Sequence, residues 1–320
     1  MARVTVPSLA KLNLDLRVLH KRRDGYHELR TIFQTVSLRD TITIDFEPGK
    51  RGSIELNSSA DIPDNLVLRA AHLAADELKI RANLRIWLKK KIPMGAGLGG
   101  GSSNAAAVLI ALTALAGKQV PLSELVRLGE QLGSDVPFFL YGGTALGLGR
   151  GTELYPLPDQ PPRSALIIAT GVHVSTAEAY RVLGREAQDE ENHNVTNALT
   201  SSREFPILRE FQVVAWNLNE SDLHQLSLVN DFEKPVFKTH RDLAAVARKL
   251  RRWGARPVLM TGSGSAIFGV FQAESELKAA TAQFLPGTAF PVNFVSRRQY
   301  RSLWRRALGP AAAASCFARY

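Results

Sequence analysis

The stretch from Pro93 to Asn104, P-M-G-A-G-L-G-G-G-S-S-N, decides how the rest of this sequence is interpreted. Its five glycines allow positive φ angles and let the backbone approach a ligand closely. An apolar helix is expected directly after it, and the N–H groups and dipole at the start of a helix favour an anion such as phosphate. The stretch therefore predicts a phosphate-binding loop. The alternative is a flexible turn that caps the helix.

Every residue of this stretch is a candidate for phosphate binding: Pro93, Met94, Gly95, Ala96, Gly97, Leu98, Gly99, Gly100, Gly101, Ser102, Ser103 and Asn104. The two serines can cap the following helix or donate their hydroxyl groups to phosphate.

Two named phosphate motifs fit this stretch less well. No lysine follows the final glycine, as the pattern G-x-x-x-x-G-K-[ST] requires. The dinucleotide pattern G-x-G-x-x-G matches Gly95, Gly97 and Gly100. However, residues 117–132 predict a turn and a helix where that fold needs a second strand ending in an acidic residue. We therefore interpret the match as accidental.

Ahead of the loop, the sequence predicts an antiparallel sheet. From Leu12 to Val18 apolar residues alternate with polar ones, which predicts a half-buried strand. Asp24 and Gly25 form a turn pair, and residues 31–37 and 41–46 are rich in β-branched and aromatic side chains.

Helices and strands alternate through the rest of the chain. Apolar residues at helical spacing cover residues 65–78, and strand alternation covers residues 84–88. Residues 105–116 are small or aliphatic nearly all round, which predicts a helix buried on most sides. Another helix is expected after Pro121. In the second half, strands are expected at 165–169, 258–260 and 266–271, and helices at 176–183 and 242–253.

A proline-rich break near residue 160 suggests a domain boundary, since Y-P-L-P begins at Tyr155 and Q-P-P at Gln160. The chain has 320 residues, enough for about two domains at roughly 150 residues each. We therefore expect an α+β protein with domains at residues 1–160 and 161–320.

Composition and charge narrow the classes of function. Cys316 is the single cysteine, so no disulfide can form within the chain. The longest apolar stretch, residues 105–116, is shorter than the roughly 20 residues that cross a bilayer, and the N-terminus lacks a secretory signal. We therefore expect a cytoplasmic protein with no membrane partner. The net charge of +10 comes from basic residues scattered along the chain, which favours a solvated surface.

One basic segment leaves a nucleic-acid alternative open. R-R-Q-Y-R-S-L-W-R-R, from Arg297, interleaves arginines with Tyr300 and Trp304, a pattern that suits stacking on bases. Helical spacing offers another interpretation, in which Leu303, Trp304 and Leu308 pack on the core and most arginines are solvated. We favour the second and expect no nucleic-acid partner.

Short segments elsewhere in the chain accompany the glycine stretch. They are S-L-A-K-L-N-L from Ser8, D-G-Y-H from Asp24, L-G-S-D-V-P-F from Leu132, N-D-F-E from Asn230 and T-G-S-G-S from Thr261. Together with residues 93–104, and in this order, they resemble the GHMP kinase superfamily over most of the chain. Within it, they are most similar to members that act on a methylerythritol linked to cytidine diphosphate.

The resemblance implies a two-domain GHMP kinase fold with its active site in the cleft between the domains. It implies that residues 1–160 bind ATP and that residues 161–320 form a substrate domain with a basic tail. The expected reaction is ATP-dependent phosphorylation of the 2-hydroxyl of the cytidine diphosphate-linked methylerythritol, in non-mevalonate isoprenoid synthesis. Homoserine, mevalonate and galactose kinases of the superfamily are the alternatives, and the D-G-Y-H segment favours the cytidyl substrate.

The same resemblance assigns catalysis to Asp135 and Lys11. Asp135 would act as the base that takes the hydroxyl proton, and Lys11 would lie beside it and polarise the acceptor hydroxyl. From the residues alone, Asp135 is equally a turn or cap residue and Lys11 a surface lysine. Mg²⁺ is expected with ATP because cations neutralise the transferring phosphates, but no acidic residue has a spacing that identifies it as a ligand.

Substrate binding is assigned, again by resemblance, to Asn13, Tyr26, His27, Tyr180, Gly262, Ser263, Gly264 and Ser265. The two tyrosines would stack on opposite faces of cytosine while His27 bonds its edge. The glycines and serines would form a second backbone nest for phosphate. Ala266 departs from the pattern, since relatives often carry cysteine there, but its small side chain should preserve the loop.

Overall fold

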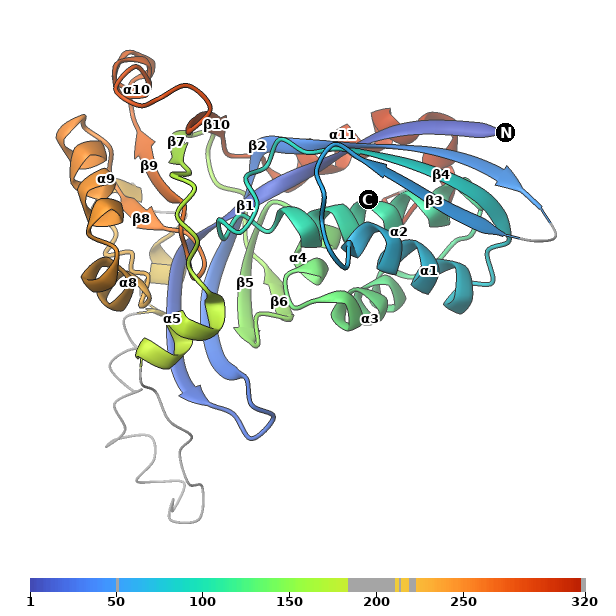
Figure 1. Ribbon diagram of the computed structural model, residues 1–320, viewed down its shortest axis with the longest axis horizontal. Helices are drawn as coiled ribbons and strands as arrows, with labels where there is room; N and C mark the ends of the chain where they lie inside the picture. Colours follow the sequence, from blue (N-terminus) through green and yellow to red (C-terminus); the bar gives the residue numbers. More distant parts are fainter. Residues whose placement is uncertain (50–51, 184–210, 213, 219–222, 318–320) are drawn as a thin grey trace.

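Two sheets, each covered by helices, make up the part of the chain that the computed structural model describes, which is residues 1–49, 52–183, 211–212, 214–218 and 223–317 (Figure 1). The larger sheet contains β1 (Ala2–Lys21), β2 (His27–Pro48), β3 (Ser53–Ser58), β4 (Ala82–Lys89), β5 (Thr144–Gly149) and β6 (Glu153–Pro156). Its order is β3-β4-β2-β5-β6, with β1 paired to β2. The smaller sheet contains β7 (Ser164–Ile168), β8 (Val258–Met260), β9 (Ile267–Phe271) and β10 (Ala289–Asn293), in the order β10-β7-β9-β8.

The helices divide between the two sheets (Figure 1). The larger sheet packs with α1 (Leu66–Glu77), α2 (Gly100–Leu115), α3 (Leu122–Leu132), α4 (Val136–Tyr141) and α11 (Arg297–Leu308). The smaller sheet packs with α5 (Thr176–Leu183), α8 (Glu233–Thr239), α9 (Arg241–Arg252) and α10 (Glu274–Thr281). Short 3₁₀ turns cover Leu223–Gln225 and Gly309–Ala314. The predicted α+β class is confirmed.

The helix after the glycine stretch is the centre of the larger unit. In α2, every residue from Ser103 to Ala114 is buried, as the absence of a polar face predicts. It packs between β1 on one side and α1 and α4 on the other. Asn65 begins α1 by accepting a hydrogen bond from the backbone N–H of Val67 at 3.0 Å. A helix enclosed on all sides gives the preceding loop a fixed base.

The prediction that the strand from Leu12 to Val18 is half-buried is wrong. The polar residues of this part of β1 are as buried as the apolar ones: Asn13 is 3% exposed, Asp15 0% and Arg17 4%. The second unit covers the polar face, because residues 229–231 pair with β1 through Leu16. The carboxylate of Asp15 is satisfied by Arg17 Nε at 2.8 Å and by the N–H of Val229 at 2.9 Å. The alternation of apolar and polar residues predicted the strand, but it could not predict that residues 229–231 would bury its polar face.

Helix α11 packs in the core of the larger unit, although its residues follow the predicted domain boundary at residue 160. Tyr300 and Trp304 are each 1% exposed, and Tyr300 donates its hydroxyl to the carbonyl of Phe139 at 2.5 Å. The nucleic-acid alternative needs these rings on the surface, so burial removes its stacking platform. The tail after α11 folds back, and Phe317 packs against both rings.

No helix among the described residues combines the length and apolar character that crossing a membrane requires.

Candidate active site

A cavity of about 1050 Å³ lies where the two units meet, and both glycine loops border it. From the larger unit it is lined by Lys11, Asn13, Thr31, Phe33, Gly95, Gly97, Gly99, Ser134 and Asp135. From the hairpin tip, the turn between β5 and β6, and the smaller unit, it is lined by Tyr26, His27, Arg150, His173, Tyr180, Gly262, Ser263 and Gly264, among others. The glycine loops and the hairpin tip border different parts of this cavity, and we name these parts the phosphate end and the base end after the ligands expected there from the sequence.

Lys11 is the buried cation of the phosphate end. Its residue is only 3% exposed, which excludes the surface-lysine interpretation. Its Nζ donates to Asn13 Oδ1 at 2.6 Å, lies 3.4 Å from Asp135 Oδ2 and sits 5.4 Å from the centre of the Phe33 ring. The backbone N–H of Lys11 donates to the carbonyl of Leu98 at 3.0 Å, which fixes the strand to the first glycine loop.

Asp135 reaches the cavity from the turn that begins α4. It occupies the N-cap position, but its side chain makes no capping hydrogen bond to that helix. The apolar residues that follow, Phe138 and Phe139, are fully buried and anchor the turn. The carboxylate is 33% exposed on the cavity side and pairs with Lys11. Segments far apart in the sequence thus bring a carboxylate and an ammonium group together.

The two glycine loops touch each other beside this pair. The N–H of Ala266 donates to the carbonyl of Ala96 at 3.2 Å, and Thr261 Oγ1 donates to the carbonyl of Gly97 at 3.3 Å. Gly97 has a φ of 75°, and a Cβ atom there would lie 2.1 Å from the carbonyl oxygen of Thr261. Glycine is required at this position because backbone of the other loop occupies the space of a side chain.

The N-D-F-E segment holds the second loop from behind. Asn230 Nδ2 donates to the carbonyls of Met260 and Gly262 at 2.7 and 2.8 Å. Glu233 Oε1 accepts from the N–H of Met260 at 2.7 Å. Burial raises the pKa of Glu233 to about 7, against the lowering effects of that hydrogen bond and of Arg251.

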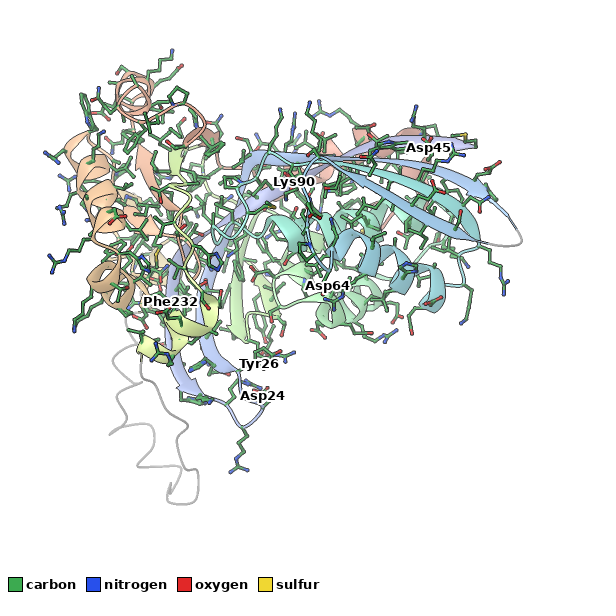
Figure 2. All side chains as sticks on the ribbon, in the orientation of Figure 1. Asp24, Tyr26, Asp45, Asp64, Lys90 and Phe232 are labelled. Atoms are coloured by element: carbon green, nitrogen blue, oxygen red, sulfur yellow. The ribbon has the colours of Figure 1, made fainter. Side chains whose placement is uncertain are left out.

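Aromatic side chains form the base end of the cavity. The His27 ring stacks on Tyr180 with centroids 4.4 Å apart and planes at 17°, and Phe232 meets Tyr180 edge-on at 4.8 Å. Burial and the charge of Asp135 raise the pKa of Tyr180 to about 12, so its hydroxyl is neutral at physiological pH. Tyr26, labelled at the hairpin tip in Figure 2, is 52% exposed and lies 4.4 Å beneath the guanidinium of Arg150.

The structure brings most of the predicted site residues to this cavity. Lys11, Asn13, Tyr26, His27, Gly95, Gly97, Gly99, Asp135, Tyr180, Gly262, Ser263 and Gly264 line it. Other residues of the glycine stretch do not line it: Ala96 and Leu98 are packed in the core, and Ser103 and Asn104 are 2% exposed behind the loop. Ser265 is likewise 2% exposed. The proposed nucleotide contacts of these residues stay predictions.

Sequence reasoning missed several lining residues. Thr31 accepts from Asn13 Nδ2 at 2.8 Å and so orients the amide that holds Lys11. Thr261 does not itself line the cavity, but it accepts from the backbone N–H of Asn13 at 3.1 Å. Arg150 and His173 face the cavity from a turn and a loop. A glycine on each side of Arg150 marks a turn, but nothing in the sequence indicates that the turn lies over Tyr26.

No group of three or more His, Cys, Asp and Glu side chains within the described residues could hold a metal ion. Asp135 is the single carboxylate among the described residues that line the cavity. A magnesium ion held by one or two carboxylates and by substrate phosphates suits such a site better than an all-protein cage does.

Family comparisons agree with this architecture. A model of the GHMP kinases N terminal domain matches residues 65–143, and a model of the GHMP kinases C terminal domain matches residues 214–286. The 4-diphosphocytidyl-2-C-methyl-D-erythritol kinase of Solibacter usitatus (strain Ellin6076) is 49% identical over 302 residues, covering 94% of this chain and 92% of the relative. The enzyme of that name from Thermotoga maritima is 40% identical over 267 residues, covering 82% of this chain and 90% of the relative.

Solved structures share this fold as well. The crystal structure of a 4-(cytidine 5'-diphospho)-2C-methyl-D-erythritol kinase has a TM-score of 0.72 at 33% identity and covers 91% of this chain and 98% of its own. A homoserine kinase from Cytophaga hutchinsonii has a TM-score of 0.67 at 18% identity, covering 92% and 95%. The second likeness shows the shared fold alone.

Proposed function

The chain belongs to the GHMP kinase family, within its branch of 4-diphosphocytidyl-2-C-methyl-D-erythritol kinases, and we propose from this premise how its cavity works. ATP is the phosphate donor, and the 2-hydroxyl of the cytidyl-linked methylerythritol is the acceptor. The observation that carries the proposal is the 3.4 Å separation of Lys11 Nζ and Asp135 Oδ2, in a cavity bordered by two glycine loops.

Lys11 and Asp135 divide the chemistry of transfer between them. The acceptor oxygen would lie within reach of both. The carboxylate takes the hydroxyl proton while the oxygen attacks the terminal phosphorus of ATP, and the bond from that phosphorus to the bridging oxygen breaks, so that ADP leaves. The ammonium group, held by Asn13 and buried beside Phe33, stabilises negative charge on the oxygens of the transferring phosphoryl group. Phosphoryl transfer demands positioning and charge compensation above all, and this pair supplies both.

The base end selects the cytidyl group. Tyr180 on α5 and Tyr26 in the hairpin between β1 and β2 both line the cavity, and so does His27, the first residue of β2. Because the His27 ring covers one face of Tyr180, a cytosine that binds on that face replaces His27 there, and the His27 ring bonds the edge of the base instead. Stacking combined with edge hydrogen bonds discriminates among bases far better than stacking alone.

Mg²⁺ bound with ATP would neutralise charge on its phosphates. The phosphate oxygens would supply its ligands, because Asp135, the single carboxylate among the described lining residues, is assigned here as the base. The cytoplasmic location stays a prediction.

The test is the release of ADP in the presence of ATP and the cytidyl substrate, with Asp135→Asn compared with the wild type. Loss of the base should lower kcat by about 100- to 10,000-fold. Asp76→Asn is a matched control, because Asp76 is exposed on α1 and does not line the cavity. Undiminished turnover of Asp135→Asn would remove this residue from its role.

A further inference from the structure

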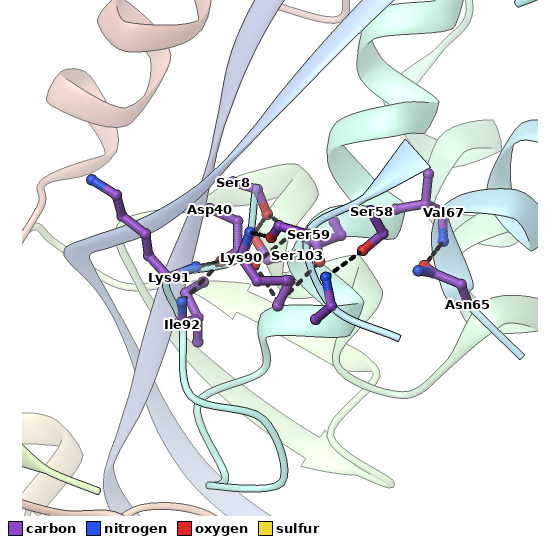
Figure 3. A network of polar contacts seen from close by, with 12 residues as sticks. Ser8, Asp40, Ser58, Ser59, Asn65, Val67, Lys90, Lys91, Ile92 and Ser103 are labelled. Carbon is purple, nitrogen blue, oxygen red and sulfur yellow. Dashed lines mark hydrogen bonds and ion pairs between the residues drawn. The ribbon is translucent and has the colours of Figure 1, made fainter. Parts of the chain in front are cut away.

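A buried polar network lies behind the first glycine loop, on the side away from the cavity (Figure 3). Its centre is Asp40 on β2, which is 0% exposed. We propose that Asp40 is a positioning residue that ties the start of the glycine loop to its end and so holds the loop in its phosphate-binding shape. This inference rests on the proposed function, since it assumes that the loop binds the phosphates of ATP.

The start of the loop is fixed by one oxygen of this carboxylate. Asp40 Oδ1 accepts hydrogen bonds from the backbone N–H groups of Lys91 at 2.6 Å and of Ile92 at 2.9 Å. These two residues lie directly before Pro93. Two charge-assisted bonds to successive N–H groups fix both the position and the direction of the chain where the loop begins.

The end of the loop is fixed by the other oxygen. Asp40 Oδ2 accepts from Asn104 Nδ2 at 2.9 Å, at the point where the loop has become α2. The same Nδ2 donates to Ser8 Oγ at 2.7 Å, and Ser8 donates to Ser103 Oγ at 2.8 Å. A single carboxylate therefore spans the gap between the two ends of the loop, and β1 supports the second end through Ser8.

Lys90 balances the charge of this brace. Its Nζ donates to Asp40 Oδ2 and, at 3.2 Å, to Asn104 Oδ1. It also lies directly under the loop, since a Cβ atom on Gly100 would be 3.1 Å from it. An unpaired carboxylate at this depth would repel the phosphates on the other side of the loop, and the ammonium group cancels that repulsion.

The Asp40→Asn variant tests the role with little change in size. Asparagine keeps an oxygen for the N–H groups of Lys91 and Ile92, but its NH₂ group faces two other donors, Lys90 Nζ and Asn104 Nδ2. The measurements are the rise in melting temperature caused by ATP, the rise caused by CDP, and the KM for ATP against kcat. We expect a KM for ATP raised about tenfold or more, a lost ATP-induced shift and a retained CDP-induced shift.

Asp45→Asn is the matched control. Asp45 lies on the same strand, is 5% exposed and pairs with Arg3 at 2.7 Å, at a point of β2 away from the residues that hold the glycine loop. Its variant should lose stability while keeping both ligand-induced shifts. If Asp40→Asn loses the ATP and CDP shifts equally, or keeps both, the brace has no specific role and the proposal is overturned.

A swap keeps the question open to test even if Asp40→Asn does not fold. The double variant Asp40→Asn with Asn104→Asp retains one carboxylate and one amide among the same partners, so Lys90 keeps its counter-charge. We expect its KM for ATP to lie within about threefold of the wild-type value. A folded double variant that no longer binds ATP would contradict the brace. A wild-type protein without an ATP-induced shift would instead contradict the proposed function itself.

Discussion

The two ends of the cavity are built in different ways. At the phosphate end, the groups that face the cavity are backbone atoms of two glycine loops and side chains that are themselves buried, such as Lys11 and Asn13. At the base end, the groups are aromatic side chains that range from Tyr26, which is 52% exposed at a hairpin tip, to Phe232, which is 1% exposed. The phosphate end thus depends on buried groups and backbone, whereas at the base end the rings of His27 and Tyr180 stack on each other.

This difference teaches where the fold permits change. A homoserine kinase shares the fold at 18% identity, and a fold by itself does not determine which substrate is bound. Replacement of an exposed side chain at the base end, such as that of Tyr26, should leave the sheet intact. Replacements at the phosphate end should therefore abolish turnover, and replacements at the base end should weaken the binding of one substrate.

Among the variants that compare the two ends, the largest effect is expected for Gly97→Ala. The new Cβ atom would lie 2.1 Å from the carbonyl oxygen of Thr261, so the two glycine loops must move apart. A displacement of this size at the reacting centre should lower kcat/KM about 100-fold or more in steady-state assays.

Gly117→Ala is the control for backbone strain. Gly117 also has a positive φ, 66°, but nothing lies within 4 Å of an added Cβ atom. Its variant should lose some stability and keep its activity. Equal losses of activity in the two glycine variants would show that the contact between the loops has no part in catalysis.

A smaller effect is expected for Tyr180→Leu at the base end. Loss of the aromatic face should raise the KM for the cytidyl substrate about tenfold and leave the KM for ATP unchanged. Tyr155→Leu is the matched control, since Tyr155 is an exposed tyrosine that does not line the cavity. A rise in the KM for ATP that equals the rise for the cytidyl substrate would erase the distinction between the two ends.

The smallest effect concerns stability rather than turnover, and it arises behind the second glycine loop. The pKa of Glu233 is about 7 in the folded chain and 4.5 ordinarily, so the folded state holds the proton more tightly. Stability from this group is therefore complete below pH 4.5 and is lost as the pH rises toward 7 and above.

Melting curves between pH 5 and pH 8 of wild type and Glu233→Gln measure this contribution. Glutamine keeps an oxygen for the N–H of Met260 but does not ionise. The melting temperature of the variant should therefore fall less with rising pH than that of the wild type. The expected difference is a few degrees, which corresponds to about 1–2 kcal/mol in the free energy of unfolding. Parallel curves for the two proteins would contradict the raised pKa.

Much of the fold could be predicted from local patterns. The helix α5 and the strand β8 lie at the residues expected from spacing and turn signals, and α2 is buried all round as its composition predicts. These elements are determined by residues close together in sequence. The cover over Asp15 and Arg17 was not predicted, because it comes from residues 229–231 of the second unit.

The candidate site divides in the same way. Lys11 and Asp135 were paired through the resemblance, since no local pattern connects a strand residue with a turn so far along the chain. No role was predicted for Asp40 or Lys90, because an aspartate between strand residues and a lysine in a basic run both have the pattern of surface charges. Their burial depends on the loop that covers them.

The central claim is that Lys11 and Asp135 act as one unit, and a double-mutant cycle of kcat with Lys11→Met and Asp135→Asn tests it most directly. If the pair acts together, each single variant should lose about 100-fold or more and the double variant should be no worse than about tenfold below the poorer single. Effects that multiply in full in the double variant would show two independent residues and contradict the account.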